Sequence, residues 1–295
     1  MHCLTHTLSS FYERVFNEKF IQQFKNCIIL IGIIALIAHL ILIAINRNFS
    51  GIPDILKIKD AYYLSAIHTP FSFILFFEVF LLIVSIPKSL TISIAKQYEI
   101  VSLIIIRNVF KDIGALESAT NWSSEIYNKL SPVLLDLAGG IIMFFLVTLF
   151  HRIIHKNFIH KTDKRINHYV EIKKSISLFL CFLLFFMALY SGLQWISHIT
   201  SGINFTGIYF YDGLFTVMIF ADVLILLFSL IYISDYELVF RDAGFIISTI
   251  LIRFSLTTPR PYDIVLGIGA MICGILILLI YNYFSFIHYG LDQED

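Results

Sequence analysis

Long apolar stretches separated by short polar ones dominate this chain. Six of them run over residues 27–45, 70–87, 133–150, 176–196, 213–233 and 263–284. Each is about 18–22 residues long, close to what a helix needs to cross a hydrocarbon core of roughly 30 Å. Each is therefore predicted to be a membrane-spanning helix.

Two further apolar stretches are marginal. They cover residues 98–113 and 243–258, and each contains one arginine, Arg107 or Arg253. If both cross the membrane, the protein has eight spans. If both are short helices that do not cross, it has six.

The basic residues between the stretches favour eight spans, because lysine and arginine concentrate on the cytoplasmic side of membrane proteins. The segment 151–174 holds seven of them: Arg152, Lys156, Lys161, Lys164, Arg165, Lys173 and Lys174. With that segment in the cytoplasm, eight spans leave 13 basic residues inside and 6 outside, whereas six spans leave 13 and 8. Eight spans also place both termini in the cytoplasm.

The two halves of the chain resemble each other. Residues 78–86 align with 222–230 at an offset of 144, and residues 102–107 align with 248–253 at an offset of 146. The polar matches carry the argument: Glu78 with Asp222, Ser85 with Ser229, Ser102 with Ser248, and Arg107 with Arg253. Four such matches in order indicate an ancient duplication. Eight spans would make the halves parallel in the membrane, and six would make them inverted.

The repeated acid and arginine are expected to form an ion pair in each half. With eight spans, Arg107 lies about 9 Å and Glu78 about 12 Å from the same membrane surface, at 1.5 Å per residue. Asp222 and Arg253 repeat this geometry. An arginine is tolerated in lipid when it is paired inside a bundle. Each pair is either a coupling site for a proton or cation, or a lock that fixes helix packing. The four matched serines are expected to continue a polar stripe along the helices from these pairs.

Two more acids are expected at the starts of helices. Asp263 follows Pro261, and both residue types suit a first helical turn, where no backbone donor is needed and an acid complements the helix dipole. Asp136 lies just inside the fourth of the eight predicted spans and is expected to play the same role.

Composition supports the membrane class and excludes several others. Hydrophobic residues make up 58% of the 295 positions and charged ones 14%, whereas a soluble domain has about a quarter charged residues. Lysine plus arginine and aspartate plus glutamate are balanced at 21 each, so no basic surface for nucleic acid is indicated. The four cysteines form no disulfide or zinc pattern. No cofactor, metal or catalytic motif is predicted.

The second half resembles the phosphate-starvation-inducible PsiE-like proteins, a family of small four-span bacterial inner-membrane proteins. The likeness rests on Asp222, the sequence Ile-Leu-Ile ending at residue 252 before Arg253, and Pro261-Tyr-Asp263 opening the last apolar stretch. This chain departs from the family by holding two units. Its first half lacks the Pro-x-Asp step and has Pro132 with a delayed Asp136. The resemblance implies four spans per half and an inner-membrane location, but no site residues.

The predicted organisation is an all-α integral membrane protein with two parallel, pseudo-symmetric four-helix units. The divisions are a cytoplasmic tail (1–26), a first unit (27–150), a basic cytoplasmic linker (151–175), a second unit (176–286) and an acidic tail (287–295). The linker is expected to bind anionic lipid head groups.

Three functions remain open from the sequence. The first is transport or conduction of a small ion or solute that uses the two acid–arginine pairs. The second is a regulatory or structural membrane protein in which the pairs only fix helix packing. The third is a membrane-embedded enzyme acting on lipid.

Overall fold

The computed structural model describes residues 2–48, 63–116, 125–154, 164–201, 209–232 and 235–291. Its α-helices are α1 (His2–Val15), α2 (Glu18–Asn48), α3 (His68–Ser85), α4 (Leu90–Leu116), α5 (Glu125–Ile154), α6 (Lys164–Ser201), α7 (Tyr209–Tyr232), α8 (Tyr236–Thr257) and α9 (Tyr262–Leu291), with a short 3-10 helix, η2 (Tyr63–Ile67), before α3. No strand occurs within these ranges. The predicted all-α class is confirmed.

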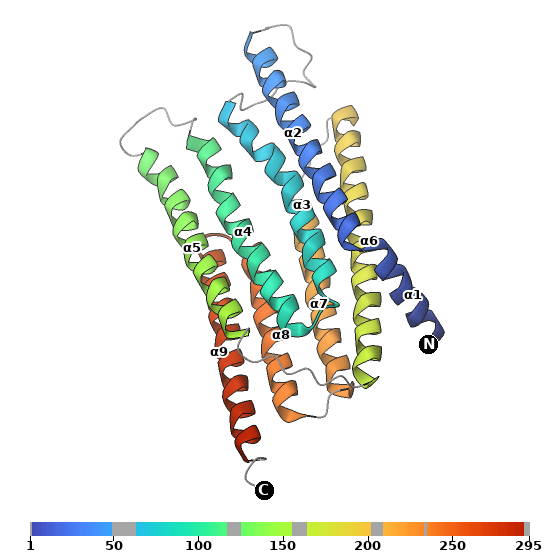
Figure 1. Ribbon diagram of the computed structural model, residues 1–295. Coiled ribbons are helices and arrows are strands. Elements are labelled where there is room, and N and C mark those ends of the chain that lie inside the picture. The colour runs from blue at the N-terminus through green and yellow to red at the C-terminus, as the bar shows by residue number, and fades with distance from the viewer. Residues whose placement is uncertain are drawn as a thin grey trace.

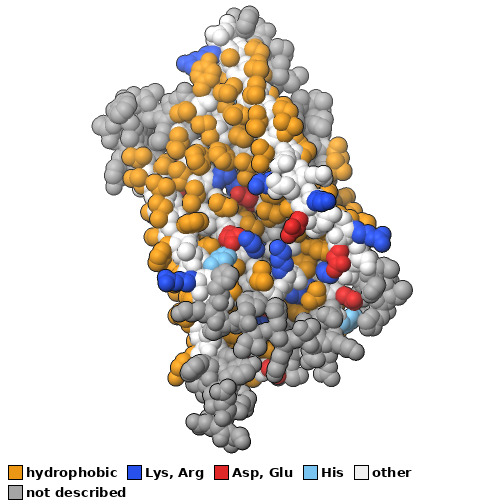
Figure 2. Space-filling model, viewed as in Figure 1, with side chains coloured by type: hydrophobic (Ala, Val, Ile, Leu, Met, Phe, Trp, Pro, Cys, Tyr) orange, Lys and Arg blue, Asp and Glu red, His pale blue; other side chains and the backbone are white. Residues whose placement is uncertain are grey.

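Within the described ranges, five helices are long and apolar enough to cross a membrane. Their spans are Glu18–Asn48, Leu130–Ile154, His168–Gln194, Gly213–Tyr232 and Tyr262–Phe284, while α3 contributes a shorter apolar helix, Thr69–Ser85. These six segments overlap the six long stretches predicted from the sequence. Apolar side chains cover most of the upper part of the face in Figure 2, and most of the charged side chains drawn there lie in a band across its middle. A surface of this kind suits contact with lipid.

The two marginal stretches belong to longer helices. α4 has 27 residues and α8 has 22, which correspond to about 40 and 33 Å. α4 begins before its apolar stretch and includes Lys96 and Glu99, which form an ion pair of 2.6 Å with each other. The hydrophobic pattern missed residues 90–97 of this helix because they include Lys96, a charge that the helix accommodates.

α2 to α9 form one bundle in which each helix runs antiparallel to its neighbours in sequence (Figure 1). Successive helices pack together in both halves, most extensively α4 with α5 and α8 with α9. Contacts of α3 with α6, α4 with α8 and α5 with α9 join the halves. The first and second halves therefore pack side by side.

The described buried residues form two clusters, and these do not correspond to the two halves of the sequence. One buried cluster is centred on α3, α6 and α7, with members such as Phe80, Leu184 and Met218. The other combines α4 and α5 with α8 and α9, around residues such as Tyr98 and Met271. Each cluster contains helices from both halves, so the halves are not separately packed bundles.

The contact between α4 and α8 is displaced from the sequence repeat. Tyr98 Oη lies 2.6 Å from Ser248 Oγ, whereas the repeat aligns Ser248 with Ser102. Ser93 and Gln97 of α4 likewise line a common cavity with Thr249 of α8. α8 is therefore shifted relative to α4 towards the end at which both helices begin.

The predicted N-terminal tail is largely helical. α1 packs along α6, where Lys174 Nζ donates to Ser9 Oγ over 3.2 Å and forms an ion pair with Glu13. Tyr12 Oη donates to the Val84 carbonyl over 2.9 Å. This carbonyl belongs to the last turn of α3, where a helix leaves its carbonyls without internal partners. α1 is thus tied to the end of α3 as well as to α6.

The predicted basic linker is also mostly helical. α5 continues to Ile154 and α6 begins at Lys164, while residues 155–163 lie outside the described ranges. Lys173 is 3% exposed and donates to the Lys88 carbonyl over 2.8 Å. Lys173 and Lys174 of this segment therefore contact protein.

Candidate functional site

The first half contains the predicted ion pair between Glu78 and Arg107. Glu78 lies on α3 and Arg107 on α4, and Arg107 Nη1 donates to Glu78 Oε2. The two helices are antiparallel neighbours joined by a short turn at 86–89, which brings the residues to a common depth. Their side chains are 11% and 8% exposed.

The second half contains the predicted pair between Asp222 and Arg253, with a forked geometry. Arg253 Nε lies 2.6 Å from Asp222 Oδ2, and Nη2 lies 3.1 Å from Oδ1. Thr249 Oγ1 lies 3.3 Å from Oδ2 and 2.9 Å from the Ile246 carbonyl, so the two oxygens share its single proton. The Arg253 side chain is 1% exposed, and its Nη1 has no hydrogen-bond partner among the described residues. This pair is closed off from solvent.

A cavity of about 350 Å³ distinguishes the first pair from the second. It is lined by α3, α4, α7, α8 and the turn into α9, so both halves contribute to it. Its polar lining residues are Arg107, Asn108, Asp112, Ser255, Thr258, Arg260 and Asp263. Arg107 thus connects the buried Glu78 to a large polar cavity.

Arg260 links the two halves at this cavity. It lies in the short turn between α8 and α9, and its guanidinium forms ion pairs with Asp112 of α4 and with Asp136 of α5, the latter at 2.7 Å. The Asp136 contact is an ion pair without good hydrogen-bond geometry. Guanidinium groups suit such sites because their donors form a planar fork.

The expectation that Asp136 begins a helix is wrong. α5 begins at Glu125, so Asp136 lies in the fourth turn, and Pro132 lies inside the helix. The residue is 0% exposed and forms its ion pair with Arg260. The polar residues that precede the apolar stretch are part of α5, which the hydrophobic pattern did not indicate.

The expectation for Asp263 is confirmed. It lies in the first turn of α9, and its Oδ1 accepts a hydrogen bond from the Ile264 amide over 2.8 Å. The residue is 6% exposed and lines the cavity. Among the residues that the structure describes, no basic side chain forms an ion pair with it.

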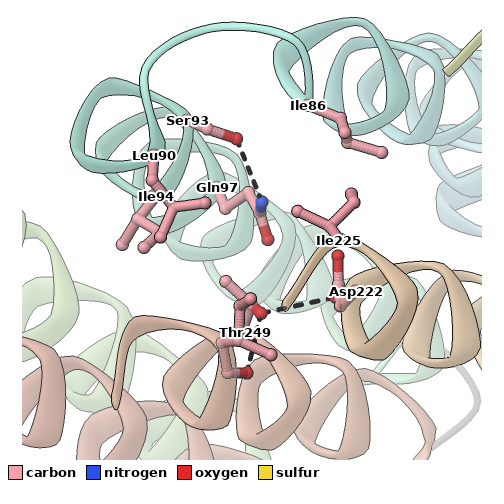
Figure 3. Close-up of a pocket in the computed structure, with 9 residues that line it drawn as sticks. Ile86, Leu90, Ser93, Ile94, Gln97, Asp222, Ile225 and Thr249 are labelled. Carbon is pink, nitrogen blue, oxygen red and sulfur yellow. Dashed lines mark hydrogen bonds between the residues drawn. The ribbon is translucent and has the colours of Figure 1, made fainter. Parts of the chain in front are cut away.

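A second, much smaller cavity of about 20 Å³ lies beside the second pair. It is bounded by α4, α7 and α8 and includes Ser93, Gln97, Asp222 and Thr249 (Figure 3). Gln97 Nε2 donates to Ser93 Oγ over 3.4 Å, while Gln97 Oε1 has no partner in the described part of the chain. A volume of this size holds about one water molecule.

The four matched serines do not form one stripe with the ion pairs. Ser85 and Ser102 donate to carbonyls of their own helices, those of Leu82 and Glu99. Ser229 and Ser248 bond across helices instead, as shown by three contacts: Ser229 with Asp242, and Ser248 with Tyr98 and with the Ala270 carbonyl. The polar match in the sequence therefore does not extend to matching contacts.

Sequence reasoning missed Asp112 and Arg260. Arg260 was placed in the loop between two apolar stretches, and Asp112 lies near the end of the stretch 98–113, where it was given no role. A signal that could have indicated Arg260 is its position between Pro259 and Pro261, three residues before Asp263. Among the described residues, no group of three or more His, Cys, Asp or Glu is arranged to hold a metal ion.

The chain has no match among protein-family models, curated proteins or solved structures. The function must therefore be argued from the geometry of the two pairs and the two cavities.

Proposed function

We propose that this multi-pass membrane protein transports or conducts a small ion or solute along the interface between its two halves. The observation that carries the proposal is the polar cavity of about 350 Å³, lined by both halves and by Arg107 of the first ion pair. A membrane protein with an apolar exterior keeps polar groups inside at a cost in free energy, so such groups commonly mark a pathway.

The positions of the two cavities support a pathway closed in its middle. α4, α7 and α8 line both of them. On α4, Gln97 lines the small cavity and Ile104 the large one, which separates them by about 10 Å. On α8, Arg253 lies between Thr249 of the small cavity and Ser255 of the large one. The Asp222–Arg253 pair would then close the pathway.

The proposal includes eight spans, with the halves as parallel units that arose by duplication. The lengths of α4 and α8 support it, since about 40 and 33 Å both suffice for a hydrocarbon core of roughly 30 Å. The same proposal includes membership of the PsiE-like family, location in the inner or plasma membrane, and a linker bound to anionic lipid. A C-terminal reporter should be active in the cytoplasm, and activity on the outer side would refute eight spans.

A specific observation favours one alternative for the second half. The Asp222–Arg253 pair is nearly unexposed and borders only the small cavity in the described structure. A regulatory or structural membrane protein would need such a pair only as a lock on helix packing. The two pairs therefore call for separate tests.

The test uses purified protein in proteoliposomes. A voltage-sensitive dye reports ion conduction, and light scattering after osmotic shock reports uptake of small neutral solutes. Glu78→Gln should reduce flux at least tenfold while the protein stays monodisperse, because Arg107 at the cavity loses its counter-charge. Glu99→Gln is the matched control, because Glu99 lies towards the opposite end of α4 and lines neither cavity.

Each result decides between the alternatives. A flux that Glu78→Gln abolishes and Glu99→Gln preserves supports transport. Proteoliposomes that pass no ion or solute in either assay would favour the structural alternative.

A further inference from the structure

We propose that the small cavity of about 20 Å³ binds one water molecule that bridges the two halves of the protein. This water donates one hydrogen bond to Gln97 of α4 and the other to the carboxylate of Asp222 on α7. The inference goes beyond the transport proposal, because a bridging water stabilises the closed second pair whether or not the protein transports a solute.

Gln97 has a buried acceptor that calls for a donor. The residue is 3% exposed, and its Nε2 donates to Ser93 Oγ over 3.4 Å, while its Oε1 has no hydrogen-bond partner in the described ranges. Figure 3 shows the amide oxygen on the side of the cavity that faces Asp222 and Thr249. Buried polar atoms usually have a partner. If the amide is turned over, its nitrogen faces the cavity instead, and a water there accepts from it.

Asp222 can accept one more hydrogen bond. Arg253 donates to both of its oxygens, and Thr249 shares its single proton between Asp222 Oδ2 and a carbonyl of its own helix. A carboxylate offers about four acceptor positions, so at least one is left on Oδ1. Ser93 Oγ accepts from Gln97 and keeps its own proton for donation. A water in the cavity can therefore make about three hydrogen bonds, as buried waters typically do.

The size and charge of the cavity favour water over an ion. A space of this size holds about one water molecule and no hydrated ion. Asp222 is already paired with Arg253, so a cation would bring an uncompensated charge next to the guanidinium, and the carboxylate would repel an anion. The remaining lining is apolar, from side chains such as Leu90 and Ile225. These side chains confine the water to the polar groups.

Crystal structures of the full chain and of Gln97→Met test the site directly. Wild type should show density for one water at about 2.7–3.2 Å from both Gln97 and Asp222. Gln97→Met should lose this density, because a thioether is only a weak acceptor. A wild-type map with ordered water elsewhere in the protein but none here would overturn the proposal. A Gln97 amide bonded directly to Asp222 would overturn it as well.

Equilibrium unfolding in detergent gives a second measurement. Gln97→Met should increase the unfolding equilibrium constant about tenfold, as expected for the loss of one or two hydrogen bonds. Gln22→Met, at an exposed position of α2, is the matched control and should have no effect. Unchanged stability of Gln97→Met would contradict the site.

A double-mutant cycle separates the water from the bond between Gln97 and Ser93. Residues that share a partner give non-additive effects, whereas independent residues give additive ones. Gln97→Met should therefore have a smaller effect on unfolding when Asp222→Asn is also present. Additive effects would overturn the bridge. Neither measurement depends on flux in proteoliposomes, so the water site and the transport proposal can fail separately.

Discussion

Arg107 and Arg253 hold matching positions in the two halves but meet different surroundings. Both donate to a carboxylate on the preceding helix. Arg107 also lines a large cavity, whereas Arg253 is enclosed by protein. A buried pair that loses one partner leaves an uncompensated charge, which costs about 3–5 kcal/mol. Under the proposed function, Arg253 is therefore expected to matter mainly for stability and Arg107 mainly for flux.

Arg253→Leu should destabilise the protein by about 3–5 kcal/mol, because it leaves Asp222 buried without its cation. Adding Asp222→Leu should recover part of that loss, since the buried charge is then gone. Denaturant unfolding in detergent measures both values. Arg14→Leu, at an exposed position on α1, is the control and should change little. A single variant as stable as wild type would show that the pair is not a lock.

Gly274→Ala should destabilise by about 1–3 kcal/mol through overpacking. A Cβ at this position of α9 would collide with the Tyr98 hydroxyl, which is itself held by Ser248 and so has little freedom to move. Gly269→Ala is the matched control on the same helix, because nothing lies within 4 Å of its added Cβ. Thermal unfolding should separate the two, and equal midpoints would contradict the close approach of α4 to α9.

At the scale of elements, α4 organises the molecule. It packs against α3, α5, α8 and α9, and it lines both cavities. The sequence predicted only its apolar middle. Hydrophobic periodicity locates the part of a helix that lipid or the protein core surrounds. It does not show whether the helix continues through a charged residue such as Lys96. The same limit hid the first turns of α5, and with them the burial of Asp136.

α1 was missed for a related reason. Its helix is short and its polar residues resemble a solvated tail, yet Leu8, Tyr12 and Val15 recur at helical spacing. The pairing of Glu78 with Arg107 could be predicted because both lie within apolar stretches, where a lone charge needs a partner. Asp112 and Arg260 lie at helix ends, where water is as plausible a partner as protein. Only the packing of the halves distinguishes those two environments.

Tyr12→Phe should cost about 1 kcal/mol, because the Val84 carbonyl at the end of α3 loses its donor. Limited proteolysis of α1 should accelerate in parallel with a lower unfolding midpoint. Tyr236→Phe removes a hydroxyl from an 81% exposed residue and should have no effect. Identical behaviour of the two variants would mean that α1 is not held by this hydrogen bond.

At the scale of the whole molecule, the halves share their cores, and α4 meets α8 out of register with the sequence repeat. The large polar cavity lies between the halves, next to the first pair. The second pair borders only the small cavity in the described structure. A duplication proposed from the sequence would in this way have produced two non-equivalent sites, one facing a cavity and one sealed.

Water access to the large cavity is the claim on which the account depends, and cysteine labelling tests it most directly. In a background without Cys3, Cys27, Cys181 and Cys273, Asn108→Cys places a thiol in the cavity. Leu103→Cys, also on α4 and 50% exposed on its outer surface, is the control.

A positively charged, membrane-impermeant thiol reagent is added from the side at which α4 ends. Asn108→Cys should react rapidly, because water and cations reach the cavity. Leu103→Cys should stay unlabelled, because hydrocarbon excludes the reagent and keeps the thiol protonated. If Asn108→Cys reacts no faster than Leu103→Cys, the cavity is dry, and the proposed pathway is contradicted.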